Sequence, residues 1–232
     1  MLLNIDCHSH ILPGVDDGSK SVDMSVGMID MLFSQGVRRI VATPHFRSHQ
    51  DNVADFTARR AEAFERLNAK LDPQLNGKIF LGAEVAIEYG LSEIENIAGL
   101  TYQGTKYILL ELPYRPFERW MTEEITNIAY EHGLTPVVAH IDRYAEWYSS
   151  RDYDEIFSLD SVLFQINNEA FLSRKSKGIV KKLISNDRPF ILGSDCHNME
   201  SRKPNFDISA AALKKYEMHY EAERFFRSLL NK

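Results

Sequence analysis

Side chains that commonly bind metal ions stand directly after short apolar runs in this sequence. Seven such runs are present, and the first is followed by the pair His8 and His10. The run from Leu163 to Ile166 is followed by an amide, Asn167, rather than by an ionisable group. The ionisable candidates that follow the other runs are His8, His10, His45, Glu84, Glu111, His140, Asp195 and His197.

These ligand types indicate which metals and which reaction to expect. Imidazole and carboxylate ligands without an obligatory thiolate suit manganese, iron, zinc or magnesium. One of the neighbouring acids Asp16 and Asp17 joins the set, which then exceeds what a single tetrahedral ion needs. The sequence therefore predicts two or three divalent ions that share at least one bridging carboxylate. Ions about 3.5–4 Å apart activate water and stabilise the oxygens of a phosphoryl group, so we expect hydrolysis of a phosphate monoester.

Each acidic candidate also has a simpler interpretation when it is taken alone. Glu84 and Glu111 could form salt bridges at the ends of buried strands, because an unpaired buried carboxylate is costly. Asp17 precedes Gly18, and Asp-Gly is a strong turn signal. Asp195 could cap a helix. The coincidence of all these acids with five histidines at the ends of apolar runs favours a metal cluster.

The elements that must position these residues alternate between strands and helices. Such alternation is typical of βαβ units and a parallel sheet. About seven units are expected, and in a parallel barrel all strands end at the face that holds the active site. An open doubly wound sheet is the alternative, but it gathers ligands at one switch point. Helices are expected over 21–35, 53–71, 118–132, 152–159, 175–186, 208–216 and 220–230.

Length and composition limit the remaining possibilities. The 232 residues, 44% hydrophobic and 26% charged, suit one globular domain over 1–232. The net charge of −6, without a concentrated basic patch, predicts no nucleic-acid partner. No apolar run approaches the ~20 residues of a membrane helix, and the N-terminus does not resemble a signal peptide. We expect a cytoplasmic protein with reduced cysteines and no membrane insertion; the sequence leaves its oligomeric state open.

A rival motif lies near the C-terminal end of the site. Cys196 and Arg202 have the C-x5-R spacing of thiol-dependent phosphatases. That mechanism needs a thiolate in a loop of converging backbone N–H groups. This loop lacks glycine and contains Glu200, and the adjacent Asp195 raises the pKa of the thiol. We therefore expect Cys196 to pack beneath the metal ligands rather than to act as a nucleophile.

The order and spacing of several short motifs resemble the polymerase and histidinol phosphatase (PHP) family. Within it, the chain looks most like the capsule-type, metal-dependent bacterial protein tyrosine phosphatases, from residue 5 to about 206. The resemblance implies a single PHP domain with an α/β fold, a distorted (β/α)7 TIM-like barrel. The motifs that show it are His8-Ser9-His10, Asp16-Asp17-Gly18, Thr43-Pro44-His45, Gly82-Ala83-Glu84, Leu110-Glu111, Ala139 to Tyr144 and Ser194 to Asn198.

The resemblance also implies a trinuclear site, and manganese is the metal expected first. Its spacing favours Asp17 over Asp16 as a ligand. Arg143 and Arg202 match the phosphate-binding arginines of the family and would serve catalysis. Carried over residue by residue, one ion would be held by His8, His10, Glu84 and Asp195, the second by Glu84, Glu111 and His140, and the third by Asp17, His45 and His197.

The predicted function is metal-dependent hydrolysis of phosphotyrosine. By resemblance, the substrate would be the tail of a bacterial tyrosine kinase that controls capsule or exopolysaccharide synthesis. Phe46 and Arg47, together with Arg143 and Arg202, would contact this substrate. Other aromatic residues of the expected mouth, such as Tyr114, could stack a phosphotyrosine ring or simply pack the loops. The alternatives are a small-molecule phosphatase, such as histidinol phosphatase, and a non-enzymatic partner that binds phosphotyrosine or the kinase.

Overall fold

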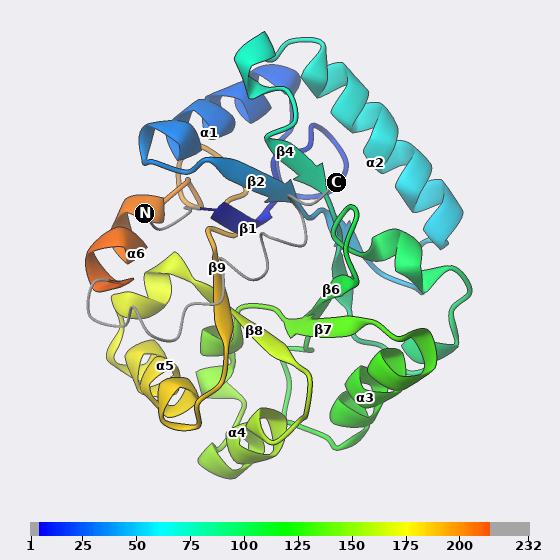
Figure 1. Cartoon of the computed structure of the whole chain (residues 1–232), viewed down its shortest axis with the longest axis vertical. Helices are drawn as coiled ribbons and strands as arrows, with labels where there is room; N and C mark the ends of the chain where they lie inside the picture. Colours follow the sequence, from blue (N-terminus) through cyan, green and yellow to red (C-terminus); the bar gives the residue numbers. More distant parts are fainter. Residues whose placement is uncertain (1–4, 214–232) are drawn as a thin grey trace.

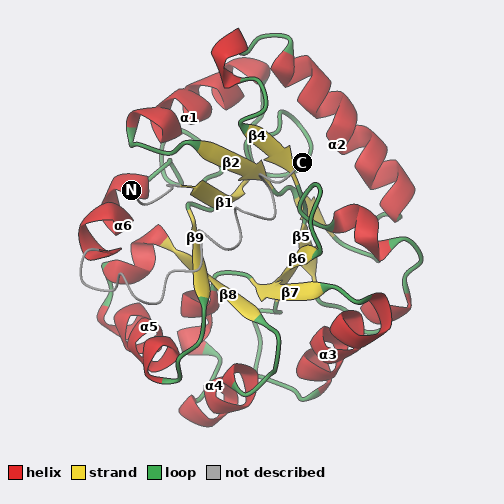
Figure 2. Ribbon diagram, in the orientation of Figure 1, coloured by secondary structure: helices red, strands yellow, loops and turns green. Residues whose placement is uncertain are grey.

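The strands of the protein are arranged in a ring, and the long helices lie outside it (Figures 1 and 2). This arrangement is seen in a computed structural model that describes residues 5–213. Every pair of hydrogen-bonded strands runs parallel. The strands are β1 (Ile5–Ser9), β2 (Arg39–Ala42), β3 (His45–Phe46), β4 (Ile79–Leu81), β5 (Glu84–Ala86), β6 (Tyr107–Glu111), β7 (Thr135–Val138), β8 (Leu163–Asn167) and β9 (Phe190–Gly193).

Six of the seven expected helices lie close to their predicted positions. The seventh, over 220–230, falls outside the described residues. None of the helices within 5–213 combines the length and the apolar character needed to cross a membrane. The helices are α1 (Val22–Ser34), α2 (Val53–Asn68), α3 (Trp120–His132), α4 (Ser150–Phe157), α5 (Arg174–Ser185) and α6 (Phe206–Leu213), with short 3-10 turns η1 (Pro73–Leu75), η2 (Leu91–Glu93), η3 (Ile97–Leu100), η4 (Ile141–Glu146) and η5 (Asn168–Phe171).

Two of the seven expected strands are each followed, after a break, by an additional short strand. A break at Thr43 and Pro44 separates β2 from β3, and a break at Gly82 and Ala83 separates β4 from β5. Pro44 has no backbone N–H with which to continue a ladder. At Gly82 a Cβ would lie 2.7 Å from the ring of Tyr102, so only glycine fits this close approach. The breaks divide the strands into two sheets, β1-β2-β4 and β3-β5-β6-β7-β8-β9.

The first and last strands lie side by side and bring the two ends of the ring together. Ser9 and Cys196 form an isolated parallel bridge just beyond β9. The Asp195 backbone N–H donates to the His8 carbonyl at 2.8 Å. The chain therefore has the predicted α/β fold with parallel strands in a distorted ring, and residues from its two ends meet at one site.

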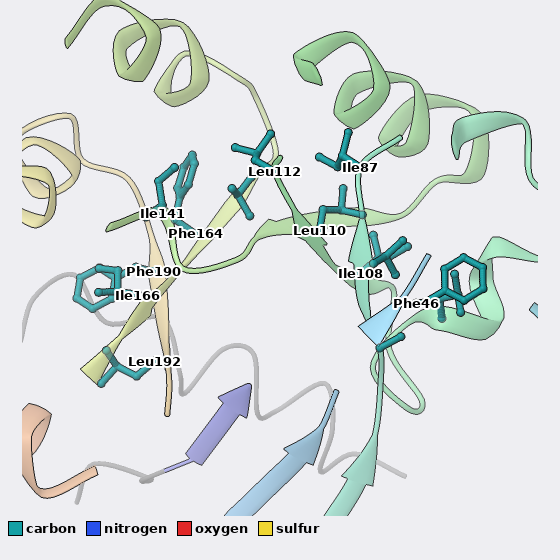
Figure 3. Close-up of a cluster of buried hydrophobic side chains, with 14 of the residues drawn as sticks. Phe46, Ile87, Ile108, Leu110, Leu112, Ile141, Phe164, Ile166, Phe190 and Leu192 are labelled. Atoms are coloured by element: carbon teal, nitrogen blue, oxygen red, sulfur yellow. The ribbon is translucent and has the colours of Figure 1, made fainter. Parts of the chain in front are cut away.

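Alternate strand residues face two different hydrophobic cores. On β6, Ile108 and Leu110 pack outward against the helices, in the large core whose side chains Figure 3 shows. Leu109 belongs to a second, smaller cluster together with residues of β1, β2, β7 and β9. Because side chains alternate along a strand, the residues in phase with Leu109 point into the ring. Glu111, two residues further on, is therefore directed toward the mouth of the ring.

Candidate metal centre

Four side chains that are far apart in the sequence form the first group of ligand atoms. The Nε2 atoms of His8 and His10 lie 3.1 Å apart. Glu84 Oε2 is 3.2 Å from the former and 3.1 Å from the latter. Asp195 Oδ1 lies 3.6 Å and 3.4 Å from the same two nitrogens. All four residues are buried, and they are the ligands that the sequence predicted for one ion.

Hydrogen bonds behind these histidines determine which ring nitrogen faces the group. His8 Nδ1 lies 3.0 Å from Gln165 Oε1, and His10 Nδ1 lies 2.7 Å from Asp16 Oδ2. Both oxygens can only accept, so each Nδ1 donates and Nε2 is the ring nitrogen that faces the group. The two Nε2 atoms lie 3.1 Å apart, and burial lowers the pKa of both rings while the surrounding carboxylates raise it more, so each pKa is raised overall. Protons therefore favour this position in the metal-free protein, and a cation would replace them.

Two buried ligand atoms have no hydrogen bond of their own within 5–213. They are Glu84 Oε2 and His197 Nε2, and both point into the cluster. A buried polar atom without a hydrogen bond is costly. The donor types and these unsatisfied atoms together fit divalent metal ions.

The second group shares Glu84 with the first. His140 Nε2 lies 2.8 Å from Glu84 Oε1 and 3.6 Å from Glu111 Oε1. Burial lowers the pKa of His140 to about 4, so its imidazole is neutral and able to bind a metal. Burial and the nearby Glu84 carboxylate raise the pKa of Glu111 to about 8. Glu84 thus offers one carboxylate oxygen to each group, which is the arrangement expected of a bridging ligand.

The third group forms around Asp17. Its Oδ1 lies 3.5 Å from both His45 Nε2 and His197 Nε2. Asp16 is used differently: besides His10, it accepts a hydrogen bond from the His45 backbone N–H at 3.0 Å. This geometry favours Asp17 as the ligand and Asp16 as the residue that holds His10 and His45 in place.

A cavity of about 210 Å³ opens over the ligand groups. Three arginines reach it, Arg47, Arg143 and Arg202, all of them predicted to contact substrate. In this structure Arg143 Nη1 contacts Asp195 Oδ2, and Arg202 Nη2 lies 2.9 Å from Asp195 Oδ1. The cavity is thus acidic at its base and cationic at its side, as a site for a phosphate bound to metal ions would be. Its lining comprises His45, Arg47, Glu84, Glu111, Tyr114, His140, Arg143, Asp195 and Arg202.

Comparison with known proteins agrees with this geometry. The family model described as capsular polysaccharide synthesis, CpsB/CapC, matches residues 4–229. The chain belongs to the CpsB/CapC family. Tyrosine-protein phosphatase CpsB of Streptococcus pneumoniae is 30% identical over 95% of this chain and 94% of the relative. Tyrosine-protein phosphatase YwqE of Bacillus subtilis is 29% identical over 89% of this chain and 82% of the relative.

The fold of this CpsB/CapC protein also matches a solved one. The similar structure comes from work on YwqE of Bacillus subtilis and CpsB of Streptococcus pneumoniae, described as unique metal-dependent tyrosine phosphatases. The TM-score is 0.73, with 24% identity over 91% of this chain and 86% of the other. This likeness confirms the predicted fold.

One predicted substrate contact is wrong. Phe46 is only 1% exposed and packs edge-on against Phe56 of α2, with ring centroids 5.2 Å apart. Its neighbour His45 points into the site, and adjacent residues of a strand face opposite sides. Phe46 therefore belongs to the outer core of the CpsB/CapC fold and does not reach the cavity.

The other aromatic residues of the mouth divide between two roles. Tyr144 and Tyr148 are buried and stack on each other, so they pack the loop after β7. Tyr114 lines the cavity and is 42% exposed. Its ring packs edge-on against Trp147, with ring centroids 5.4 Å apart. Of the aromatic residues within 5–213, Tyr114 is the one in the cavity lining.

The rival thiol mechanism receives no support from the structure. Cys196 is fully buried, and burial raises the pKa of its thiol well above the usual range. A thiol that stays protonated is a poor nucleophile. Cys196 packs in the core beneath the ligands, as the sequence predicted.

Sequence reasoning missed two residues that support the ligands, Asp16 as a partner of His10 and Gln165 as a partner of His8. The signal for Gln165 was its position inside an apolar run, where a buried amide needs hydrogen-bond partners. Asp16 had no comparable signal, because either acid of the turn was an equally good candidate.

Proposed function

We propose that this CpsB/CapC protein is a single-domain, metal-dependent phosphatase that hydrolyses phosphotyrosine in proteins. The observation that supports this most strongly is the cavity itself, where overlapping groups of ligand atoms lie beneath three arginines. The family and the names of its relatives support the same reaction. The proposed substrate is the phosphorylated tail of a bacterial tyrosine kinase that controls capsule synthesis. The proposed location of the phosphatase is the cytoplasm.

The cations would be held by the three ligand groups described above, with Glu84 shared between two of them. Two or three ions are proposed, with manganese first and iron, zinc or magnesium as alternatives. When bound, they lower the pKa of water and supply positive charge near the phosphate oxygens.

The arginines are proposed to bind the phosphate. Arg143 and Arg202 now contact the carboxylate of Asp195, which is also a ligand candidate. When Asp195 binds a cation, its negative charge is offset, and the two guanidinium groups can turn to phosphate oxygens. A guanidinium offers paired N–H donors that match phosphate geometry, so these side chains would orient the substrate.

The leaving group explains why a tyrosyl ester suits this site. A tyrosinate has a pKa of about 10, so it leaves more readily than an alkoxide does. The ring of Tyr114 at the cavity wall offers a flat apolar surface beside the phosphate position. A phosphotyrosine ring could stack there while its phosphate reaches the arginines.

The test compares turnover of a phosphotyrosyl peptide with turnover of histidinol phosphate by the metal-loaded protein. We expect a strong preference for the peptide. A preference for histidinol phosphate would replace the proposal with a small-molecule phosphatase. Metal-loaded protein that hydrolyses neither substrate would indicate a binding partner instead.

The role of the arginines is tested with Arg143→Ala. We expect bound metal to be retained at saturating concentration and kcat to fall about 100-fold, the usual scale for losing one charge-stabilising donor. The matched control is Arg115→Ala, since Arg115 is a surface arginine outside the cavity lining that pairs with Glu118. Its kcat should stay within about twofold of the unmodified protein, as expected for an exposed ion pair.

A further inference from the structure

A buried amide lies between two of the ligand groups. Gln165 is in β8, fully buried, and flanked by Phe164 and Ile166, which face the outer core. Alternation along the strand therefore directs Gln165 into the ring, beneath the candidate ligands. The polar atoms of a buried amide need hydrogen-bond partners, because leaving them unpaired destabilises the folded protein.

The amide oxygen of Gln165 serves both groups at once. Oε1 lies 3.0 Å from His8 Nδ1 and accepts from the His140 backbone N–H at 2.6 Å. The amide nitrogen donates to Asn167 Oδ1 at 2.9 Å. Because a backbone N–H can only donate, the atom that faces His140 must be the oxygen. The same oxygen then requires the Nδ1–H tautomer of His8, which leaves Nε2 free for a cation.

The contact with His140 stabilises an unusual backbone conformation. His140 has φ +28° and ψ 52°, a region that non-glycine residues rarely adopt. This conformation directs the imidazole toward Glu84 and Glu111. Strained residues persist only where their surroundings hold them in place, and the bond to Gln165 is one such restraint.

The neighbouring strand leaves room for the amide. Gly193 of β9 pairs with Asn167 of β8. A Cβ on Gly193 would lie 2.8 Å from Gln165 Nε2 and 2.5 Å from the Cβ of His8. A side chain at Gly193 would therefore displace either the amide or the histidine that it orients.

We propose that Gln165 is a positioning residue that prepares two ligand groups together, through the tautomer of His8 and the backbone of His140. It touches neither the substrate nor the reacting atoms. The inference rests on the proposed metal site, and it does not depend on which phosphate ester is hydrolysed.

The first test needs no variant. Long-range ¹H–¹⁵N correlation spectra of the unmodified protein after chelation report the ring tautomers. We expect Nδ1 of His8 to carry a proton, whether the ring is neutral or cationic. An Nδ1 without a proton would overturn the proposal, because the amide oxygen would then not be orienting the ring.

The second test compares metal affinity in variants by calorimetric titration with Mn²⁺. Gln165→Met keeps the length of the side chain but removes both acceptor contacts, and affinity should fall about 10- to 100-fold, as for other residues that orient metal ligands. Gln165→Glu keeps an acceptor oxygen, although it adds a negative charge and loses the donor to Asn167, and it should bind Mn²⁺ more tightly than Gln165→Met does. The matched control, Phe164→Leu, alters the outer face of the same strand and should leave the affinity unchanged.

The outcomes separate this inference from the proposed function. Equal Mn²⁺ affinity in the unmodified protein and Gln165→Met would refute the positioning role even if phosphotyrosine is hydrolysed. Equal losses in Gln165→Met and Phe164→Leu would also refute it, because general destabilisation would then explain the effect. A protein without phosphatase activity that still shows the specific loss would contradict the proposed function alone.

Discussion

His10 shows how one side chain is prepared for a cation by its neighbours. The carboxylate of Asp16 accepts from its Nδ1 at 2.7 Å, so Nε2 is the ring nitrogen that faces Glu84 and Asp195. His140 is prepared differently, since burial lowers its pKa to about 4 and keeps the ring neutral. At this scale the chemistry depends on tautomer and protonation state, which hydrogen-bond partners and burial determine.

Metal affinity should decrease as the pH falls below about 8, the raised pKa of Glu111. In the metal-free protein, burial and the charge of Glu84 raise the pKa of Glu111 to about 8, so protons and cations compete for this carboxylate below that pH. Release of one proton predicts an apparent affinity that falls about tenfold per pH unit on the acidic side. Mn²⁺ titrations between pH 6 and 9 measure the slope.

The control for this prediction is Glu111→Gln, which removes the titrating group. At high pH this variant should bind Mn²⁺ more weakly than the unmodified protein does. Its Mn²⁺ affinity should also vary less with pH. An affinity that is constant across the range in the unmodified protein would contradict the prediction.

Tyr114 should contribute its ring rather than its hydroxyl to substrate recognition. Tyr114→Ala is expected to lower kcat/KM for a phosphotyrosyl peptide about threefold to tenfold, the range expected for one aromatic contact. Tyr114→Phe keeps the ring and loses a long contact of 3.4 Å between the hydroxyl and His140 Nδ1, so it should stay close to the unmodified protein. Both variants should hydrolyse an alkyl phosphate at the unmodified rate, and an equal loss on both substrates in Tyr114→Ala would exclude a stacking role.

At the scale of elements, a helix holds the break between β4 and β5. Arg60 of α2 is buried and donates to the carbonyl oxygens of Gly82 at 2.6 Å and Gly99 at 3.0 Å. Gly82 lies at the break between β4 and β5, which places Glu84 at the start of β5. A charged donor thus satisfies one carbonyl group at the broken ladder and another in η3.

Removing this donor should destabilise the fold. Arg60→Leu is expected to lower the free energy of unfolding by about 2–3 kcal/mol, because buried carbonyl groups lose a charged donor. Arg59→Leu is the matched control, since Arg59 lies next to it on α2 but is exposed and paired with Asp51; it should cost less than about 1 kcal/mol. Urea unfolding measures both, and equal losses would contradict the role assigned to Arg60.

Sequence patterns predicted the elements better than the contacts between them. The apolar runs and the helix signals placed the helices within 5–213 close to where they lie. Strand alternation could also have excluded Phe46, since His45 and Phe46 must face opposite sides. Pro44 could have signalled the first break, since it lacks a backbone N–H. The break at Gly82 depends on the approach of Tyr102, a contact between distant residues that no local pattern reports.

At the scale of the whole molecule, the ring brings residues far apart in the sequence to one site. His8 lies in β1 and Asp195 follows β9, yet their ligand atoms lie 3.6 Å apart. The rule that parallel strands end on one face predicts this meeting from the sequence. The rule could not predict that Gln165 orients His8 and Asp16 orients His10, because those hydrogen bonds depend on side-chain conformations across the ring.

The account depends on cations held at this mouth being required for phosphotyrosine hydrolysis. The most direct measurement determines bound metal by elemental analysis and phosphotyrosine hydrolysis in the same samples, before chelation, after chelation and after adding Mn²⁺. We predict that bound metal and hydrolysis are lost together on chelation and return together when Mn²⁺ is added. In His8→Ala neither should return. Full hydrolysis by protein shown to contain no metal would contradict the account.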